Sequence, residues 1–175
     1  MDTTTTLGTV RRRDGAWELH FDRHLKHRPE KVWRAITESE HLEHWLPCDI
    51  VGERRAGADL ALPFWPPMVD KYDIGEPVLT GRIETWDPPH VFEWMWDDDR
   101  LRFELDPDGD GTRLRFTTWI PGEEALAIDS SAGYHVCFDR LTALVDTGRG
   151  APLEDHPMEL QERYEAAADA RAGEA

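Results

Sequence analysis

The sequence is short of basic residues. It holds 20 Lys and Arg against 36 Asp and Glu, which gives a formal net charge of −16. A nucleic-acid-binding protein needs a basic face to neutralise phosphates, and anionic membranes attract basic segments. The one dense basic run, Arg11–Arg13, is more typical of a solvated strand edge. The composition therefore predicts no nucleic-acid partner and no membrane partner.

Cysteine and long apolar runs are also scarce. Cys48 and Cys137 are the two cysteines, and they form no CxxC pair, which argues against a disulfide scaffold or a cysteine metal site. No apolar run approaches the roughly 18 residues of a membrane span. The opening MDTTTTLGTV lacks the basic and apolar regions of a signal peptide. These absences predict a cytoplasmic protein.

A long amphipathic helix is the main feature that is present. The stretch 124–147 repeats apolar residues with i, i+3, i+4 spacing, which indicates one apolar stripe. The stripe consists of Ala127, Tyr134, Cys137, Phe138, Leu141 and Val145. His135 and Asp139 are expected on the opposite, polar side. A stripe of this width needs a broad apolar partner.

The preceding hundred residues predict that partner, an antiparallel sheet. Apolar and polar residues alternate with period two between turn residues, as in half-buried strands. The expected strands are 9–13, one from residue 16, 58–64, 78–86, 91–96, one around 101–105 and one around 114–116. Two short helices are expected after the strand from residue 16: Pro29–Thr37, and one capped by Ser39 and running to Leu46. The Pro-rich stretch 65–77 predicts a long loop.

The domain organisation follows from these elements. We expect a flexible tail over 1–8, one domain over 9–148, and a linker with an acidic helical extension over 149–175. Leu160 and Tyr164 are the expected contacts of that last helix. Self-association through the Trp65–Tyr72 segment or a sheet edge stays open.

Three polar clusters invite functional interpretations, and each has a simpler one. Asp106 to Gly111 resembles the start of a calcium-binding loop, but Thr117 stands at the twelfth position where Glu is needed, so a hairpin turn is favoured. His41 and His44 share a helical spacing but lack a third metal ligand. His20 and His24 fall on the outer face of a strand. No cofactor motif occurs, so neither a metal nor a cofactor is predicted.

The strongest constellation is aromatic. The expected inward faces bring together side chains that would line a cavity between sheet and helix: Phe64, Trp94, Trp96, Phe103, Phe116, Tyr134 and Phe138. The alternative is a solid core of large side chains, which any sheet-plus-helix domain needs. No catalytic residue is identified, although Tyr134 and His135 would bring polar groups near such a cavity.

Four motifs together resemble the START-like (SRPBCC, Bet v-like) superfamily, in the branch named for homologues of the activator of the heat-shock-protein-90 ATPase. They are PEKVWRAITESEHLEHWL at 29–46, GRIETWDPPHVFEWMW at 81–96, DPDGDGTRLRFTTW at 106–119 and GYHVCFDRLTALV at 133–145. Tyr134 stands at a position of the last motif where this family usually has Trp. The resemblance implies an α+β helix-grip fold: a curved antiparallel sheet of about seven strands around a long C-terminal helix.

Function follows less directly, because one fold hosts many activities. The leading hypothesis is a cavity that binds a small hydrophobic or aromatic molecule. The alternatives are a cyclase, dehydratase or hydrolase using the same cavity, and a co-chaperone-like interaction module. The activators that lend the branch its name carry an extra N-terminal domain that this chain is too short to hold, which argues against a chaperone partner.

Overall fold

Seven strands and five helices make up the computed structural model, which describes residues 6–150 and 155–173. Residues 1–5, 151–154 and 174–175, at the expected tail and extension, lie outside the described residues. The elements are β1 (Thr9–Arg13), β2 (Ala16–Leu25), α1 (Pro29–Thr37), α2 (Ser39–Leu42), β3 (Asp59–Pro63), α3 (Pro66–Tyr72), β4 (Val78–Asp87), β5 (Val91–Trp96), β6 (Asp99–Asp108), β7 (Gly111–Ile120), α4 (Glu124–Thr147) and α5 (Met158–Ala172).

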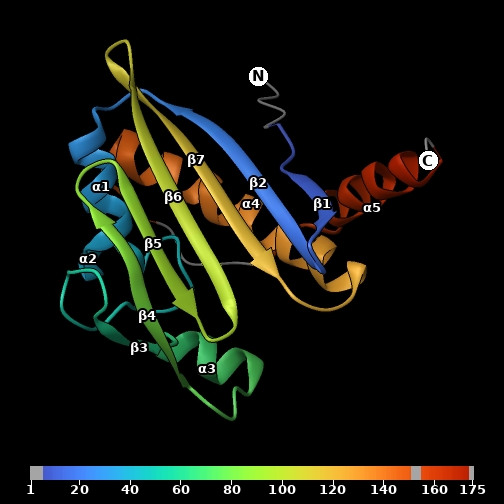
Figure 1. Ribbon diagram of the computed structural model, residues 1–175, viewed down its shortest axis with the longest axis horizontal. Helices are drawn as coiled ribbons and strands as arrows, with labels where there is room; N and C mark the ends of the chain where they lie inside the picture. The colour runs from blue at the N-terminus through green and yellow to red at the C-terminus, as the bar shows by residue number, and fades with distance from the viewer. Residues whose placement is uncertain (1–5, 151–154, 174–175) are drawn as a thin grey trace.

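The strands form one antiparallel sheet in the order β1-β2-β7-β6-β5-β4-β3. In Figure 1 the sheet curves in front of α4, with α1 and α2 at one end, α3 beside β3 and β4, and α5 beyond β1. Gly148 ends α4 in the left-handed conformation, which favours glycine. The predicted helix-grip fold and the expected helix over 124–147 are confirmed.

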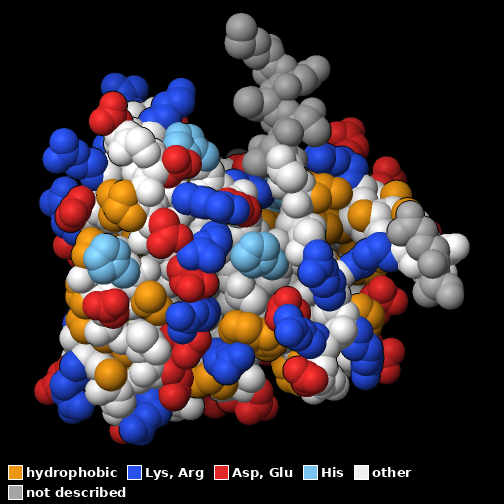
Figure 2. Space-filling view, turned by 45° about the horizontal axis from the view of Figure 1, so that its top comes forward, with side chains coloured by type: hydrophobic (Ala, Val, Ile, Leu, Met, Phe, Trp, Pro, Cys, Tyr) orange, Lys and Arg blue, Asp and Glu red, His pale blue; other side chains and the backbone are white. Residues whose placement is uncertain are grey.

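Alternation along the strands divides the sheet into an apolar and a charged face. On the inner face Phe103 lies 4.7 Å from Phe116 and 6.4 Å from Phe138, measured between ring centroids. On the outer face Arg113 pairs with Asp22 across neighbouring strands, and Figure 2 shows acidic and basic side chains interspersed there. Hydrophobic burial on the inner face is the main stabilising contribution, while exposed ion pairs contribute little.

Several local predictions hold. Asp108 and Gly111 are the last and first residues of β6 and β7, so the acidic stretch is a hairpin and not a calcium loop. His20 and His24 lie on the outer face, bonded to Thr117 and Asp108. The basic run Arg11–Arg13 lies exposed on the edge strand β1.

Three predictions about the short helices are wrong. The 65–77 stretch is not a continuous loop, because α3 occupies Pro66–Tyr72. Its two prolines stand at the first helical positions, where no backbone N–H is needed. Ser39 is not the N-cap of α2 but its first residue, and its hydroxyl donates to Asp49 instead. The second helix ends at Leu42, four residues early.

The placement of His135 is also corrected. It is not on a solvent-facing side of α4 but buried, because α5 packs against that side of the helix. Tyr164 of α5 accepts a hydrogen bond from the Gly8 N–H at 2.9 Å, and its hydroxyl lies 2.9 Å from Nδ1 of His135. Burial lowers the pKa of His135, and the nearby Asp139 carboxylate partly offsets this. Both faces of α4 are therefore covered, one by the sheet and one by α5.

No helix among the described residues combines the length and apolarity needed to cross a membrane.

The aromatic core generates a stability prediction. Phe103→Ala is expected to lower the free energy of unfolding by about 3–5 kcal/mol, because the change leaves a cavity among rings that cannot fully collapse. Phe103→Leu should cost less, about 1 kcal/mol. Urea unfolding of the two variants measures both values. A loss below 1 kcal/mol for the alanine variant would show that Phe103 is not part of a solid core.

The Tyr164 hydroxyl generates a second prediction. Tyr164→Phe is expected to lower the free energy of unfolding by about 1–2 kcal/mol, because it leaves the buried His135 nitrogen without its partner. Tyr72→Phe is the matched control. Its hydroxyl bonds to Asp155 at an exposed site, so its removal should change stability by less than about 0.5 kcal/mol. Equal effects of the two changes would contradict the buried role of Tyr164.

Candidate functional site

A groove runs along one edge of α4 at the end of the sheet. It consists of two neighbouring recesses that share Trp96, Ser130 and Tyr134, and we call the pair the aromatic groove. Trp96 ends β5, whereas Ser130 and Tyr134 lie one helical turn apart on α4. The spacing i, i+4 places both helical residues on the same edge.

The first recess, the α3-side recess, has a volume of about 290 Å³. Beyond the shared residues its walls come from Pro47, Met68, Tyr72, Gly133, Val136, Cys137, Asp155 and His156. Asp155 accepts hydrogen bonds from Lys71 and Tyr72 of α3. These contacts join α3 to the segment before α5 at the rim of the recess.

The second recess, the turn-side recess, has a volume of about 360 Å³. It lies beside the turn between β5 and β6. Beyond the shared residues its walls come from Phe64, Leu79, Asp97, Asp98, Asp99, Ile120, Pro121 and Leu126. Aromatic and aliphatic side chains thus face three carboxyl groups.

Trp96, which lines both recesses, stacks on a second indole that lies in the core. Trp94 and Trp96 lie 5.8 Å apart with ring planes 26° from parallel, and Phe64 lies 6.0 Å from Trp96. The indole N–H groups of both tryptophans are shielded from solvent, and neither has an acceptor among the described residues. A buried donor without an acceptor costs about 1–3 kcal/mol. The two N–H groups that carry this cost lie beside the groove.

Tyr134 is the polar aromatic group of the groove. Its ring packs on Phe116 at 4.9 Å and lies 6.5 Å from Phe138. Burial raises the pKa of its hydroxyl well above the ordinary value, and the Asp99 carboxylate adds to the increase. The hydroxyl is therefore protonated at neutral pH and can donate a hydrogen bond but cannot serve as a base.

Asp99 is the most perturbed acid of the groove. It is half-buried at the start of β6. Burial raises the pKa of Asp99 to about 6, and the charges of Asp97 and Asp98 act in the same direction. An acid of this kind in a cleft is a feature of functional sites, although structural carboxylates also show it.

The seven aromatic residues predicted to line a cavity separate into two groups. Phe64, Trp96 and Tyr134 line the groove. Trp94, Phe103, Phe116 and Phe138 are fully buried and contact other aromatic rings of the core. Contact of a ligand with any of the seven stays a prediction.

Two other sequence candidates lie in different surroundings. His135 contacts Phe21 and Tyr164 on the α5 side of α4. Cys137 borders the α3-side recess as a free thiol, and burial raises its pKa to about 12, so it is not a reactive thiolate.

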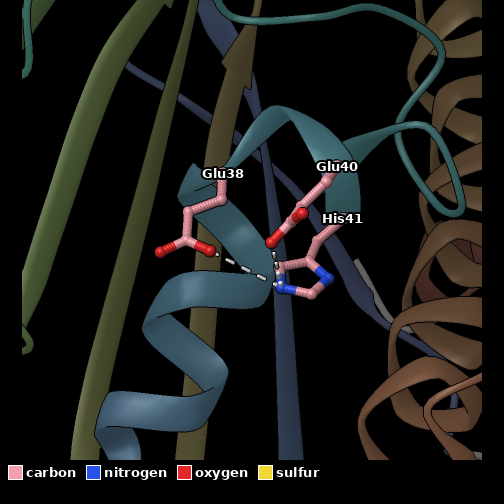
Figure 3. Close-up of side chains that lie close together, drawn as sticks. All are labelled: Glu38, Glu40 and His41. Atoms are coloured by element: carbon pink, nitrogen blue, oxygen red, sulfur yellow. Dashed lines mark ion pairs between the residues drawn. The ribbon is translucent and has the colours of Figure 1, made fainter.

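A cluster of titratable groups near α2 has an ordinary explanation. Glu38 and Glu40 flank His41, with carboxylate oxygens 3.6 and 3.7 Å from its Nε2 (Figure 3). Both glutamates are exposed, and charged pairs of this kind are common on surfaces without a metal. His44, the second histidine considered from sequence, instead lies 3.7 Å from Glu43.

Sequence reasoning missed the polar and small residues of the groove. Asp97 to Asp99, Ser130 and Gly133 are not among the candidates that the sequence patterns predict. The helical spacing of Leu126, Ser130, Gly133 and Cys137 along one edge of α4 was the available signal. The contribution of α3 had no signal, because its prolines suggested a loop.

Comparison with known proteins agrees with this architecture. Residues 26–146 match the family model described as Activator of Hsp90 ATPase homolog 1-like protein. The chain belongs to this family. The match extends from the residue after β2 to the last turn of α4, and it includes every lining residue of the two recesses except Asp155 and His156. Comparison with curated proteins gave no match.

Solved structures with the family's fold superimpose over most of the chain. A conserved protein of unknown function from Enterococcus faecalis has a TM-score of 0.74 at 21% identity, covering 93% of this chain and 91% of its own. The solution structure of CalU16 from Micromonospora echinospora has a TM-score of 0.67 at 21% identity, covering 99% and 100%. At this identity the likeness shows the fold alone.

Asp99 generates a prediction about pH. Its folded-state pKa lies above the ordinary 3.8, so the folded protein holds a proton that the unfolded chain releases between pH 4 and 6. The carboxylate therefore lowers stability above pH 6 and has no such effect below pH 4. With allowance for solvent screening at this half-exposed site, Asp99→Asn should raise the free energy of unfolding by about 1 kcal/mol at pH 7.

Urea unfolding at pH 7, 5.5 and 4 measures this gain, which should shrink as the pH falls. Asp98→Asn is the control: Asp98 is exposed, so its replacement should give a smaller gain. A gain for Asp99→Asn that does not vary with pH would contradict the assignment.

Proposed function

We propose that this member of the family binds a small hydrophobic or aromatic molecule in the aromatic groove. The observation that carries the proposal is the pair of recesses on either side of Trp96 and Tyr134, lined mainly by apolar side chains. Small-molecule sites are concave, largely apolar and supplied with a few polar groups. Here those groups are the Tyr134 hydroxyl and the carboxyl of Asp99.

Gly133 supports the proposal from the side of the helix. It lies in the middle of α4, where glycine costs about 1 kcal/mol relative to alanine. A Cβ atom at this position would meet no atom within 4 Å, so packing does not require glycine. The missing side chain instead keeps the α3-side recess open.

Acid–base catalysis in the same groove is the second candidate. Asp99 favours it, because a carboxyl with a pKa of about 6 can exchange protons near neutral pH. Its partner would be the protonated Tyr134 hydroxyl as a hydrogen-bond donor. His135, considered from sequence for the same role, contacts Tyr164 and not the groove. Turnover of a bound ligand that is lost in Asp99→Asn, with binding retained, would identify this activity.

Ligand binding is tested with a neutral aromatic probe, tryptophol. A ligand that binds only the folded state raises the melting temperature with concentration, and calorimetry gives its Kd. Trp96→Ala removes the wall shared by both recesses and should weaken binding about tenfold or more, since burying an aromatic face contributes on the order of 1–2 kcal/mol.

A glycine pair supplies the matched control. Gly133→Leu should fill the α3-side recess and weaken binding, whereas Gly133→Ala should preserve binding and raise stability by up to about 1 kcal/mol. Trp119→Phe, on the outer face of β7, should bind as the wild type does. Unchanged binding in both Trp96→Ala and Gly133→Leu would overturn the proposal.

A further inference from the structure

The turn-side recess combines aromatic rings and carboxyl groups, and no basic side chain that the structure describes lies in its lining. Asp97, Asp98 and Asp99 contribute to its lining, while no Lys, Arg or His does. Within the described residues, none of the three carboxylates forms an ion pair with a basic side chain. No basic side chain of residues 6–150 or 155–173 therefore neutralises the negative charge of the recess by an ion pair.

The nearest basic residue in sequence does not supply the missing charge. Arg100 follows Asp99 directly, but strand alternation turns it to the outer face of the sheet. There its guanidinium lies 3.8 Å from the ring centroid of Trp119. Arg102, two residues on, pairs with Glu93 and Glu104 on that same face. The basic side chains of β6 are thus already engaged away from the recess.

Turn chemistry accounts for only part of the acidic triplet. Asp97 has a φ of 53°, a left-handed conformation that Asp and Asn tolerate, and its N–H donates to the Thr80 carbonyl at 3.0 Å. Asp99 has already entered β6 and needs no special backbone. It is half-buried and lines the recess.

We propose that the turn-side recess receives a positively charged nitrogen, so that the ligand of the groove is an amphipathic organic amine or quaternary ammonium. This rests on the proposed function, because the apolar body of the same ligand must occupy the groove beside Trp96 and Tyr134. The cation lies between the Asp99 carboxylate and the aromatic faces, which attract cations through their ring quadrupoles. Ile120 and Leu126 contact its hydrocarbon part.

Electrostatics of the free protein agree with this assignment. The raised pKa of Asp99 reflects burial and two like charges without a compensating cation. An ammonium group in the recess would favour the ionised carboxylate and return the pKa towards its ordinary value. The net charge of −16 would also accelerate the approach of a cation.

Three probes with one ring system separate charge from shape: tryptamine, tryptophol and indole-3-acetate. Calorimetry with the full chain at pH 7.5 and low salt is expected to give tryptamine a Kd at least tenfold below that of tryptophol, and indole-3-acetate the weakest binding. Added salt should weaken the binding of tryptamine and leave the binding of tryptophol unchanged.

Asp99→Asn is the decisive variant, because it is expected to fold more stably than the wild type. It should raise the Kd of tryptamine about tenfold and change the Kd of tryptophol less than twofold. The double variant Arg113→Gln, Asp22→Asn removes one charge of each sign from the outer face and serves as the matched control, with all three affinities unchanged.

Each outcome decides between the two levels of the proposal. Equal affinity for tryptamine and tryptophol, both weakened by Trp96→Ala, would overturn the cation assignment and leave ligand binding in place. No binding of any probe to the wild type would overturn both.

Discussion

The packing of α4 against the curved sheet is the contact on which the rest of the structure depends. Phe138 is its centre: the ring contacts Phe21, Phe103 and Phe116 of three adjacent strands. These rings fill the space between α4 and the middle of the sheet, and the groove lies at the edge where Trp96 meets Ser130 and Tyr134. The aromatic groove is the space left there, so the same packing that stabilises the fold also sets the place and size of the site.

The polar groups on the two sides of α4 differ in whether they have hydrogen-bond partners. The α5 face holds a buried polar pair, His135 and Tyr164, whose hydrogen-bonding groups serve each other. The groove edge holds polar groups that are not paired in this way: the Trp96 N–H and the carboxyl of Asp99. Buried polar groups normally have partners. The contrast between the two sides of one helix separates a structural cluster from a candidate site, although sequence placed His135 among the functional candidates.

Much of the fold was predictable, because it rests on periodicity. Alternation identified the strands, and the stripe through Cys137 and Leu141 identified α4. The site was less predictable, because its residues are defined by where packing stops. Phe103 and Trp96 look alike in sequence, both apolar and on inward faces. One lies in the solid core and the other at the groove, and only the position of α4 and α3 decides between them. Asp99 likewise reads as turn chemistry until its neighbours are known.

The central claim is that a ligand contacts Trp96 in the aromatic groove. The most direct measurement is the ¹⁵N NMR spectrum of the tryptophan indole N–H groups during titration with an aromatic ligand. The account predicts that the Trp96 signal moves most and the Trp94 signal next, while the Trp119 N–H, which lies 3.2 Å from a Glu18 oxygen on the outer face, stays in place. Saturable binding that shifts Trp119 and leaves Trp96 unmoved would contradict it.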